Sequence, residues 1–497
     1  MSHSLLKPAK NHERENDGLV QETTPSKPED QVRKRQGLSL LERLGDTERR
    51  SKLLQSWMIA WAYFSLGLTA GMNGASLLDL QIITATDLES ASAFFTGSIG
   101  GGMAGSLFCG IVFNKINTRL LMFTALSALG VVTIITPYCS IYALMIFIRA
   151  ISGFFSGAIG TSGSALHMKI WGSDGKVLMQ ILHFFFALGA VLSPLYTEPF
   201  LAKRIMKNET DADNFTIGNA SHLHTENGPQ TTNVQYAYLV SGVFMIIASI
   251  PFVVLFIKQR SQDTQLHQEQ NINIKITYRE LPCCLHLFVL TSVCTFILLQ
   301  SCVELTFSVF LMPFLINEYD SMTKAASVYI VSVFWVSFAT SRFLMIFVSK
   351  LLSCARLLSL CLLLMMVAFT GFIISAIFEV IPAVVVFTAL AGLGMSAVYP
   401  AAFSWAEAEL LKVTARVAAS ITVTSATGKF FIPLILGFLM EEVSNMWFCY
   451  LLLGQAVLVC FIFIFLLLFN RLFINKVYGS TTLIENNIVA DIKDIAL

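Results

Sequence analysis

Charged residues are scarce in this chain. Only 13% of its 497 residues are Asp, Glu, Lys or Arg, against about 25% in a typical soluble domain. The formal net charge is +1, which gives no electrostatic reason to expect a nucleic-acid partner. Hydrophobic residues make up 55% of the chain. A soluble enzyme of this composition would be difficult to keep in water.

Several common sequence signatures are also missing. The first 52 residues are polar and contain no apolar core of a signal peptide, so we expect the first apolar stretch to act as the insertion signal. Nearly all ten cysteines lie within or beside apolar stretches, which argues against a disulfide-stapled secreted domain. The sequence shows no nucleotide-binding loop, zinc cluster or hydrolytic triad. We therefore expect no covalent chemistry, no bound metal and no cofactor.

What the chain does have is twelve apolar stretches, arranged as two blocks of six. Most are about 20 residues long, enough for an α-helix to cross roughly 30 Å of hydrocarbon. A helix also satisfies its own backbone hydrogen bonds there. The expected spans are 57–80, 93–113, 120–138, 141–165, 177–200, 236–257, 284–315, 326–349, 357–377, 381–403, 417–440 and 447–469. The sequence therefore predicts an all-α membrane protein with twelve transmembrane helices in two six-helix bundles.

This pattern divides the chain into five parts. We expect an N-terminal tail at 1–52, an N-terminal bundle at 53–257, a polar linker at 258–283, a C-terminal bundle at 284–470 and a C-terminal tail at 471–497. If the N-terminus is cytosolic, twelve Lys and Arg residues fall in the inner loops and four in the outer loops. That bias is the one expected for cytoplasmic loops. Both tails and the linker are then predicted to be cytoplasmic.

The longest outer loop supplies an independent check on this orientation. It carries three Asn-x-Ser/Thr sequons, at Asn208, Asn214 and Asn219. Glycosylation of such a site requires the lumenal side of the membrane. We expect at least one of the three asparagines to be glycosylated.

Basic residues after the second span recur after the eighth. Gly110-Ile-Val-Phe-Asn-Lys-Ile-Asn-Thr-Arg119 follows the second span, and Ser349-Lys350 with Arg356 follows the eighth. The first segment resembles, in degraded form, the Gly-x-x-x-Asp/Asn-Arg/Lys-x-Gly-Arg signature of the major facilitator superfamily. The resemblance implies two bundles that rock about a central site. An ordinary basic inner loop is the alternative for this segment taken alone.

The fourth span contains an arginine at membrane depth. Arg149-Ala-Ile-Ser-Gly153 resembles the Arg-x-x-x-Gly element of the same superfamily. An intramembrane arginine is costly unless it faces a cavity or a partner, so we expect Arg149 to form an ion pair, structural or with substrate. A stripe of small residues follows on the same helix: Gly153, Ser156, Gly157, Gly160 and Ser164. Such a stripe lets helix backbones approach closely.

The fifth span narrows the resemblance. It contains Gln180, then His183-Phe-Phe-Phe-Ala-Leu-Gly-Ala190, then Ser193-Pro194. Further matching pieces are Asp79-Leu80, Glu304 with Phe307, Phe334-Trp335, Arg342 and Gly392-Leu-Gly-Met-Ser-Ala-Val-Tyr399-Pro400. Together they resemble the sodium-dependent glucose transporter branch, which is related to bacterial fucose permeases. The resemblance implies transport of a hexose such as glucose across the plasma membrane by a monomer, with sodium as a candidate co-substrate.

A sugar site should combine amides, carboxylates and aromatic rings in a mostly pre-formed cavity. The candidates for binding the substrate are Asn73, Gln180, His183, Phe184, Gln300, Glu304 and Phe307. Three- and four-residue spacing places Gln180, His183 and Phe184 on one face of the fifth helix. The same spacing places Gln300, Glu304 and Phe307 on one face of the seventh.

Charged residues within the spans are candidates for coupling or ion pairs. Asp79 and Glu304 are costly carboxylates at membrane depth and suit a proton, a sodium ion or a sugar hydroxyl. Arg342 and Lys429 are their candidate counter-charges.

Each candidate also has a structural alternative. Gln180 and His183 can cross-link helices, and Asp79 can meet bulk water. Glu304 can simply neutralise Arg342, and Lys429 can snorkel to an interface. Phenylalanines in such spans also serve as core or lipid-facing packing.

Two departures from the family pattern bear on sodium. The fourth helix has Gly160-Thr-Ser-Gly-Ser164 where relatives carry Asp-Thr-Gly-Gly-Asn, so a carboxylate and an amide are missing. Near the eleventh helix, Gly428-Lys429 stands where relatives tend to have an acidic residue after glycine. We therefore hypothesise weaker or absent sodium dependence. An organic-ion exchanger and a non-transporting sensor of transporter ancestry are the two alternative functions.

Overall fold

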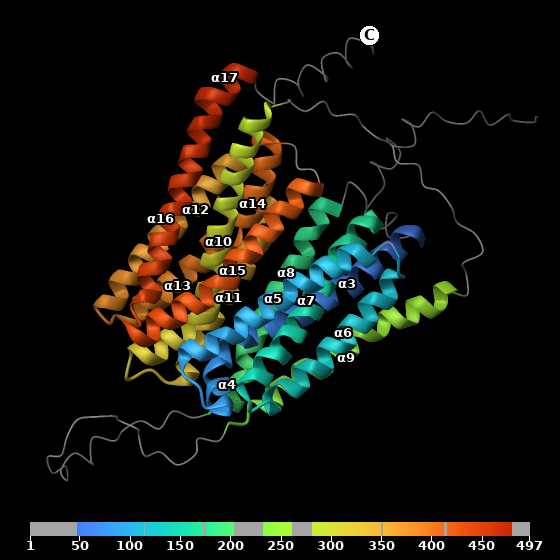
Figure 1. The fold of residues 1–497 in the computed structure, drawn as a ribbon, viewed down its shortest axis with the longest axis vertical. Coiled ribbons are helices and arrows are strands. Elements are labelled where there is room, and N and C mark those ends of the chain that lie inside the picture. The colour runs from blue at the N-terminus through green and yellow to red at the C-terminus, as the bar shows by residue number, and fades with distance from the viewer. Residues whose placement is uncertain are drawn as a thin grey trace, which may run out of the picture. The chain divides into compact units, whose positions relative to one another are not determined.

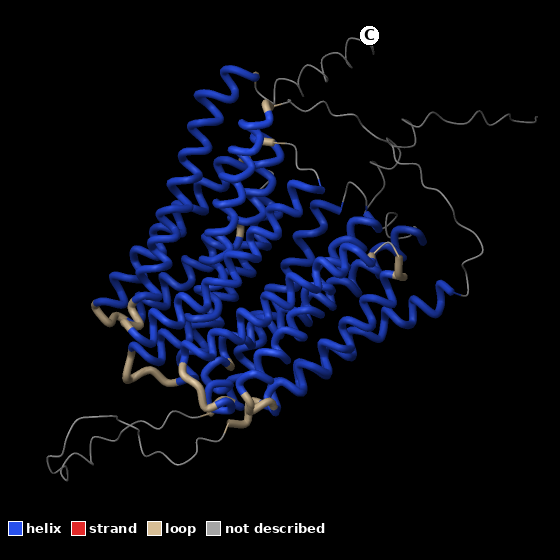
Figure 2. Tube along the Cα trace, in the orientation of Figure 1, coloured by secondary structure: helices blue, strands red, loops and turns tan. Residues whose placement is uncertain are grey.

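The computed structural model describes residues 47–113, 115–171, 175–202, 232–260, 281–348, 351–411 and 415–479. Within these ranges every regular element is a helix and there is no strand (Figure 2). Contacts separate a short unit, Met1–Leu54, from the unit Gln55–Leu497, and the fold described below is that of the second unit. Most of the predicted tails and of the linker lies outside the described residues, so the five-part division stays a prediction.

The first half of the chain contains these elements: α3 (Thr47–Ala75), α4 (Leu77–Thr84), α5 (Leu88–Val112), α6 (Thr118–Ile135), η1 (Thr136–Tyr138), α7 (Tyr142–Trp171), α8 (Gly175–Thr197), η3 (Glu198–Phe200) and α9 (Gln235–Arg260). Two of them begin at side-chain caps, because Asp87 accepts a hydrogen bond from Ser90 N and Asn117 accepts one from Arg119 N. Helix α5 packs against α7, and α6 against α9 (Figure 1).

The second half contains these elements: α10 (Cys283–Glu318), α11 (Lys324–Val348), α12 (Cys354–Ile377), α13 (Ile381–Ser396), α14 (Val398–Trp405), the π-helical turn η5 (Ala406–Leu410), α15 (Ala415–Glu442), α16 (Trp447–Phe469), the π-helical turn η6 (Asn470–Ile474) and α17 (Asn475–Tyr478). Helix α10 packs against α15 and α16 (Figure 1). We refer to α3–α9 as the first half and to α10–α17 as the second half.

Among the described residues, eleven helices are long and apolar enough to cross a membrane. They match the second to twelfth predicted spans. The first predicted span, 57–80, is helical as well, as α3 and α4, but it is less apolar. From Ile59 to Ala75 every side chain of α3 is buried or half-buried. A helix enclosed by protein needs less hydropathy than one facing lipid, so the twelve-helix prediction agrees with this fold.

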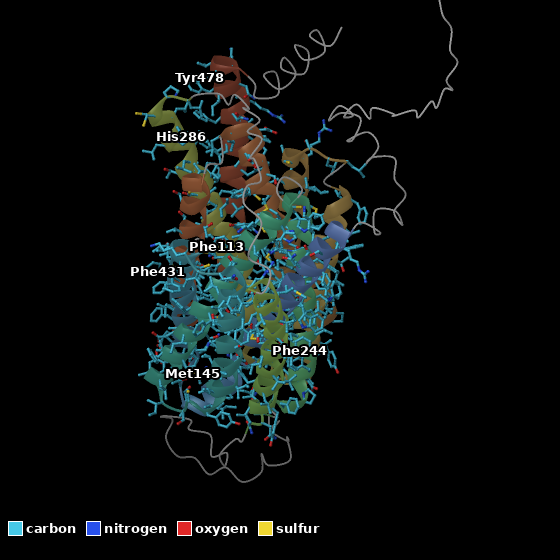
Figure 3. The ribbon with its side chains drawn as sticks, turned by 90° about the vertical axis from the view of Figure 1, so that its right-hand side faces the viewer. Phe113, Met145, Phe244, His286, Phe431 and Tyr478 are labelled. Carbon is cyan, nitrogen blue, oxygen red and sulfur yellow. The ribbon has the colours of Figure 1, made fainter. Side chains whose placement is uncertain are left out.

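Large apolar side chains cover the outside of the helices. Leu363 is 64% exposed, Phe461 66% and Phe431 53%. Figure 3 shows Phe431 projecting at the edge of the helices. Contiguous exposed apolar surface is rare on a soluble monomer. The outer surface is therefore suited to lipid.

Glycines bring α5 and α7 into backbone contact. A Cβ added to Gly153 would overlap the carbonyl oxygen of Ser98, and one added to Gly101 would overlap that of Ala150. Only a residue without a side chain allows this approach. Close packing is thus confirmed for Gly153 in the predicted small-residue stripe. Gly160 differs, because nothing lies within 4 Å of an added Cβ there.

These two glycines give a matched pair of substitutions. Gly153→Ala forces α5 and α7 apart, and overpacking of this kind costs about 1–3 kcal/mol or more. We expect a lower melting temperature of the purified protein and less folded protein in the membrane. Gly160→Ala, on the same helix, should leave both unchanged. Equal melting temperatures for the two variants would contradict the packing described here.

Candidate functional site

The ends of the helices form two sets, because successive spans run in opposite directions. We call the set beside segment 203–231, which carries the predicted sequons, the sequon end. The opposite set, beside segment 261–280, is the linker end. Figure 3 shows Met145 toward the first and His286 toward the second.

A buried ion pair joins the two halves at the sequon end. Lys324 Nζ, at the start of α11, lies 3.1 Å from Asp79 Oδ2 in α4. The other oxygen, Asp79 Oδ1, accepts hydrogen bonds from Ala202 N at 2.7 Å and from the Thr232 hydroxyl at 2.6 Å. Asp79 is fully buried, so the alternative that it meets bulk water is wrong. Its counter-charge is Lys324, which corrects the prediction of Arg342 or Lys429.

Helices α5 and α15 make further contacts between the halves. The Leu88 amide donates to Glu441 Oε2 at 3.3 Å, and the Thr96 hydroxyl donates to the Phe430 carbonyl at 3.0 Å. Both bonds lie in the part of these helices toward the sequon end. Polar contacts and the ion pair together hold the halves against each other at that end.

A groove of about 320 Å³ adjoins the ion pair. Its lining comes from both halves: Leu78, Gln81, Ile82 and Thr86 from α4 and the residues after it, and Ile316, Asn317 and Lys324 from α10 and α11. This volume is at the lower limit of the roughly 300–1,000 Å³ usual for small-molecule pockets.

Nearer the linker end, α8 faces α11 across the two halves. The rings of Phe184 and Phe343 have centroids 5.7 Å apart. His183, the neighbour of Phe184, lies within electrostatic range of Arg342. The guanidinium of Arg342 stacks on the Phe338 ring, 4.8 Å from its centroid. The predicted residues His183, Phe184 and Arg342 therefore come together at one interface.

Glu304 extends this group from α10. Its carboxylate acts electrostatically on Arg342 and on Tyr399 of α14. Among the described residues, no carboxylate lies within 4.0 Å of Arg342, so the pair is not a contact ion pair. Glu304 and Tyr399 are half-buried and keep exposed surface. His183, Arg342, Glu304 and Tyr399 thus form a polar group supplied by both halves, which we call the interface cluster.

Two other predicted residues of α10 face the interior of the second half. Phe307 is fully buried, with ring centroids 5.1 Å from Phe334 and 5.7 Å from Phe369. It is a core residue, so its prediction as a substrate contact is wrong for this state. Gln300 is also buried, and its Nε2 donates to the Met395 carbonyl at 3.5 Å. Residues 300 and 307 lie about two turns apart on one face of α10, and Glu304 between them is half-buried.

The structure says less about the remaining predicted residues, which include Gln180 on α8 and Lys429 on α15. The backbone of Gln180 is helical, but its side chain lies outside the described residues, as do Asn208, Asn214 and Asn219. Lys429 is half-buried and acts electrostatically on Cys302 of α10. Within the described residues it makes no ion pair within 4.0 Å.

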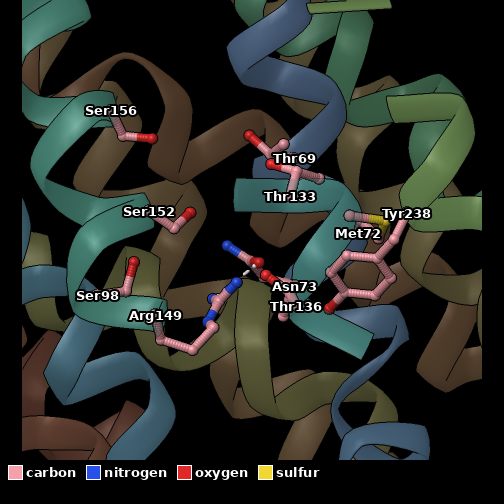
Figure 4. Close-up of a pocket in the computed structure, with 10 residues that line it drawn as sticks. All are labelled: Thr69, Met72, Asn73, Ser98, Thr133, Thr136, Arg149, Ser152, Ser156 and Tyr238. Carbon is pink, nitrogen blue, oxygen red and sulfur yellow. Dashed lines mark hydrogen bonds between the residues drawn. The ribbon is translucent and has the colours of Figure 1, made fainter. Parts of the chain in front are cut away.

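Arg149 and Asn73 meet in the interior of the first half. Arg149 Nη2 donates to Asn73 Oδ1 at 2.9 Å, as the dashed line in Figure 4 shows. Only 5% of Arg149 is exposed, and its Cζ lies 6.0 Å from the centroid of the Phe95 ring. Among the described residues no carboxylate lies within 4.0 Å of Arg149, so its partner within the protein is a neutral amide; an ion pair with substrate stays a prediction. Asn73 was predicted to bind substrate, and in this state its carbonyl oxygen is used by Arg149.

Sequence reasoning missed Lys324 as the partner of Asp79. The available signal was that Asp79, a carboxylate within a span, requires a cation, and that Lys324 is a basic residue at a span boundary on the same side. The two residues are 245 positions apart, and no local pattern links them. Among the described residues, no group of three His, Cys, Asp or Glu side chains is placed to hold a metal ion.

Two helical halves with an apolar exterior and a polar group between them define a membrane transporter. The sequence profile of the Major Facilitator Superfamily matches residues 59–431, and the chain belongs to this superfamily. A crystal structure of a bacterial homologue of the human lysosomal transporter Spinster, inward-facing and unoccupied, has the same fold. It superimposes with a TM-score of 0.59 at 10% identity, covering 85% of this chain and 98% of that chain.

Relatives of known name agree with the narrower resemblance. Sodium-dependent glucose transporter 1A of Mus musculus is 27% identical over 414 residues, which cover 81% of this chain and 93% of the relative. Sodium-dependent glucose transporter 1 of Homo sapiens is 26% identical, covering 78% and 74%. Major facilitator superfamily domain-containing protein 4A of Xenopus tropicalis is 25% identical, covering 80% and 88%. The predicted superfamily is thereby confirmed, and the chain is similar to members of the predicted branch.

The ion pair at the sequon end gives a direct test of how the halves are held together. Lys324→Met leaves Asp79 buried without a counter-charge, and removing one partner of a buried pair costs about 3–5 kcal/mol. We expect the halves to separate more often at that end. The substitution Ser92→Cys reports this separation, because Ser92 is buried against Gly437 of α15. Its labelling rate by a polar maleimide should rise about tenfold in purified protein whose native cysteines are replaced.

Lys324→Arg is the control, because it keeps the charge, and its labelling rate should stay near that of the parent. An unchanged rate in Lys324→Met would show that the ion pair does not hold the halves.

Proposed function

We propose that this protein carries a hexose such as glucose across the plasma membrane by alternating access. The interface cluster is the observation that supports this most directly. His183 belongs to the first half and Arg342, Glu304 and Tyr399 to the second, so a ligand held between them would contact both halves. A carboxylate, an imidazole and a phenol offer the donors and acceptors that sugar hydroxyls need. The names of the relatives favour a sugar among small polar substrates.

The state described here fits an inward-facing carrier. The ion pair of Asp79 with Lys324 and the bonds from Leu88 and Thr96 all close the sequon end. We propose that the sequon end faces outside, that both tails are cytosolic and that the asparagines of segment 203–231 are glycosylated. Opening outward then requires these contacts to break, as expected when one bundle rocks against the other around a fixed site.

Phe184 is a second kind of contributor to the proposed site. Its ring packs on Phe343 across the halves and is half-buried. An aromatic face there can stack against the apolar face of a sugar ring. Gln180 lies one helical turn from Phe184 and stays in the proposal on spacing alone.

A test of the cluster is the substitution Glu304→Gln. It keeps the shape of the side chain but removes the negative charge that acts on Arg342 and an acceptor for sugar hydroxyls. We expect hexose uptake into vesicles to fall by about tenfold or more, since hydrogen bonds to charged groups are worth about 1.5–3 kcal/mol. Glu318→Gln, at the sequon end of the same helix, is the control and should transport normally.

Protein abundance in the vesicles is measured in parallel. Normal uptake by Glu304→Gln at equal abundance would remove Glu304 from the site.

We also propose that sodium dependence is weak or absent. Lys429 on α15 stands in the second half where relatives tend to carry an acidic residue. Asp79, a candidate for binding sodium, already accepts from three donors. In Arg149 and Arg342 the chain also has two buried or half-buried cations without contact carboxylates, which favours an organic-ion exchanger as the second candidate.

Replacing external sodium with choline tests this point. We expect tracer hexose uptake to change by less than about twofold. The reason is that the fourth helix lacks, at Gly160 to Ser164, the carboxylate and the amide that relatives carry there. A large loss of uptake would instead establish coupling to sodium. Uptake of an organic anion only in exchange for internal anion would favour the exchanger, and binding without uptake would favour a sensor.

A further inference from the structure

Arg149 is a buried cation without a counter-ion among the described residues. Its contacts with protein groups are the hydrogen bond to Asn73 and the face of the Phe95 ring at 6.0 Å. Its Nε makes no hydrogen bond, and no carboxylate of the described chain lies within 4.0 Å of the guanidinium. An intramembrane charge in this condition is costly. The fold therefore bears a positive charge at this place that something else must compensate.

A small cavity lies beside the guanidinium. Its volume is about 30 Å³, and it is lined by residues of α3, α5, α6, η1, α7 and α9 (Figure 4). One water molecule needs roughly 10–15 Å³ of such volume, so the cavity holds one or two waters or one monatomic ion. Pockets for organic ligands are about ten times larger. A hexose or an organic anion does not fit in this state.

The cavity is lined by hydrogen-bond donors that have no partner. Serine and threonine in helices commonly donate to a backbone carbonyl one turn earlier, and two lining residues do so: Thr69 donates to the Leu66 carbonyl and Thr136 to the Val132 carbonyl. The Tyr238 hydroxyl is paired with Ser76 Oγ at 2.9 Å. Four further lining hydroxyls have no hydrogen bond among the described residues: Ser98, Thr133, Ser152 and Ser156. Their protons are available to a ligand.

Asn73 adds a donor whose direction is fixed by Arg149. A guanidinium has no acceptor, so the amide must present its oxygen to Arg149 and its nitrogen elsewhere. Figure 4 shows that nitrogen directed into the space beside Ser152. The Arg149 side chain, the Asn73 amide and these four hydroxyls line the same small volume.

We propose that this cavity binds a small monovalent inorganic anion of the size of chloride. The positive charge excludes a cation, and the volume excludes a carboxylate-bearing metabolite. One such anion neutralises Arg149 and accepts from the amide and the hydroxyls. Bound anion stabilises the first half in this state, because it offsets the desolvation of the guanidinium. The site is separate from the interface cluster and does not depend on which substrate the protein carries.

Thermal unfolding of the purified full-length protein tests the proposal. Sodium chloride is compared with sodium gluconate at equal concentration, since gluconate is too large for the cavity. A ligand that binds only folded protein raises the melting temperature with its concentration. We expect chloride to raise it by about 3 °C or more over gluconate. Bromide should act like chloride, and its anomalous scattering in crystals should place it beside Arg149.

Substitutions within the cavity separate an anion from water. Arg149→Gln should abolish the chloride shift, whereas Arg119→Gln, at the linker end of α6, should keep it. Ser152→Ala should raise, by about fivefold, the chloride concentration that gives half of the maximal rise in melting temperature. Thr136→Val is its matched control, because that hydroxyl already donates to Val132, and it should leave the concentration unchanged.

Equal melting temperatures in chloride and gluconate, with no bromide in the cavity, would mean that only water fills it and would overturn the proposal. A chloride shift that persists in Arg149→Gln would also overturn it. If Arg149→Gln does not fold, Ser152→Ala and Thr136→Val are compared instead. Equal chloride dependence of the melting temperature in these two variants would then overturn the proposal. None of these measurements uses transport, so their failure is distinguishable from failure of the proposed hexose carrier.

Discussion

The cost of placing a charge among apolar helices determines much of this structure. Each cation at membrane depth is compensated differently. Lys324 forms a contact ion pair with Asp79, and Arg342 stacks on Phe338 with Glu304 at longer range. Arg149 has only an amide, a ring and free hydroxyls. The first of these joins helices of different halves, so the charges of Asp79 and Lys324 also determine one place where the halves touch.

The contacts within a half differ in kind from the contacts between halves. Within the first half, α5 and α7 are joined backbone to backbone at Gly101 and Gly153, and such packing has no second arrangement of similar energy. Between the halves, an ion pair and a few hydrogen bonds carry most of the polar contact, and water can replace these when the end opens. Rigid halves with an exchangeable boundary are what rocking-bundle transport requires.

The helices could be predicted from the sequence because the bilayer imposes a local rule: each span needs about 20 apolar residues whatever its neighbours are. Contacts between residues of different helices follow no such local rule. His183 and Phe184, predicted to share a helix face, both lie at the interface with α11. Spacing could not show that Phe307 packs in an aromatic core while Glu304 stays half-buried, because that depends on how α10 is rotated against the helices around it. Likewise, Asp79 and Lys324 meet only because two distant helix ends converge.

Asp79 also holds both edges of the segment that carries the sequons. Its Oδ1 binds Ala202 on one side of 203–231 and Thr232 on the other, and the Asn233 amide donates to the Phe200 carbonyl alongside. One carboxylate thus anchors the entry and the exit of this segment. Adding residues between fixed anchors changes closure entropy only slowly with length. The stretch between the anchors is for this reason a suitable place to graft an epitope or a fluorescent domain.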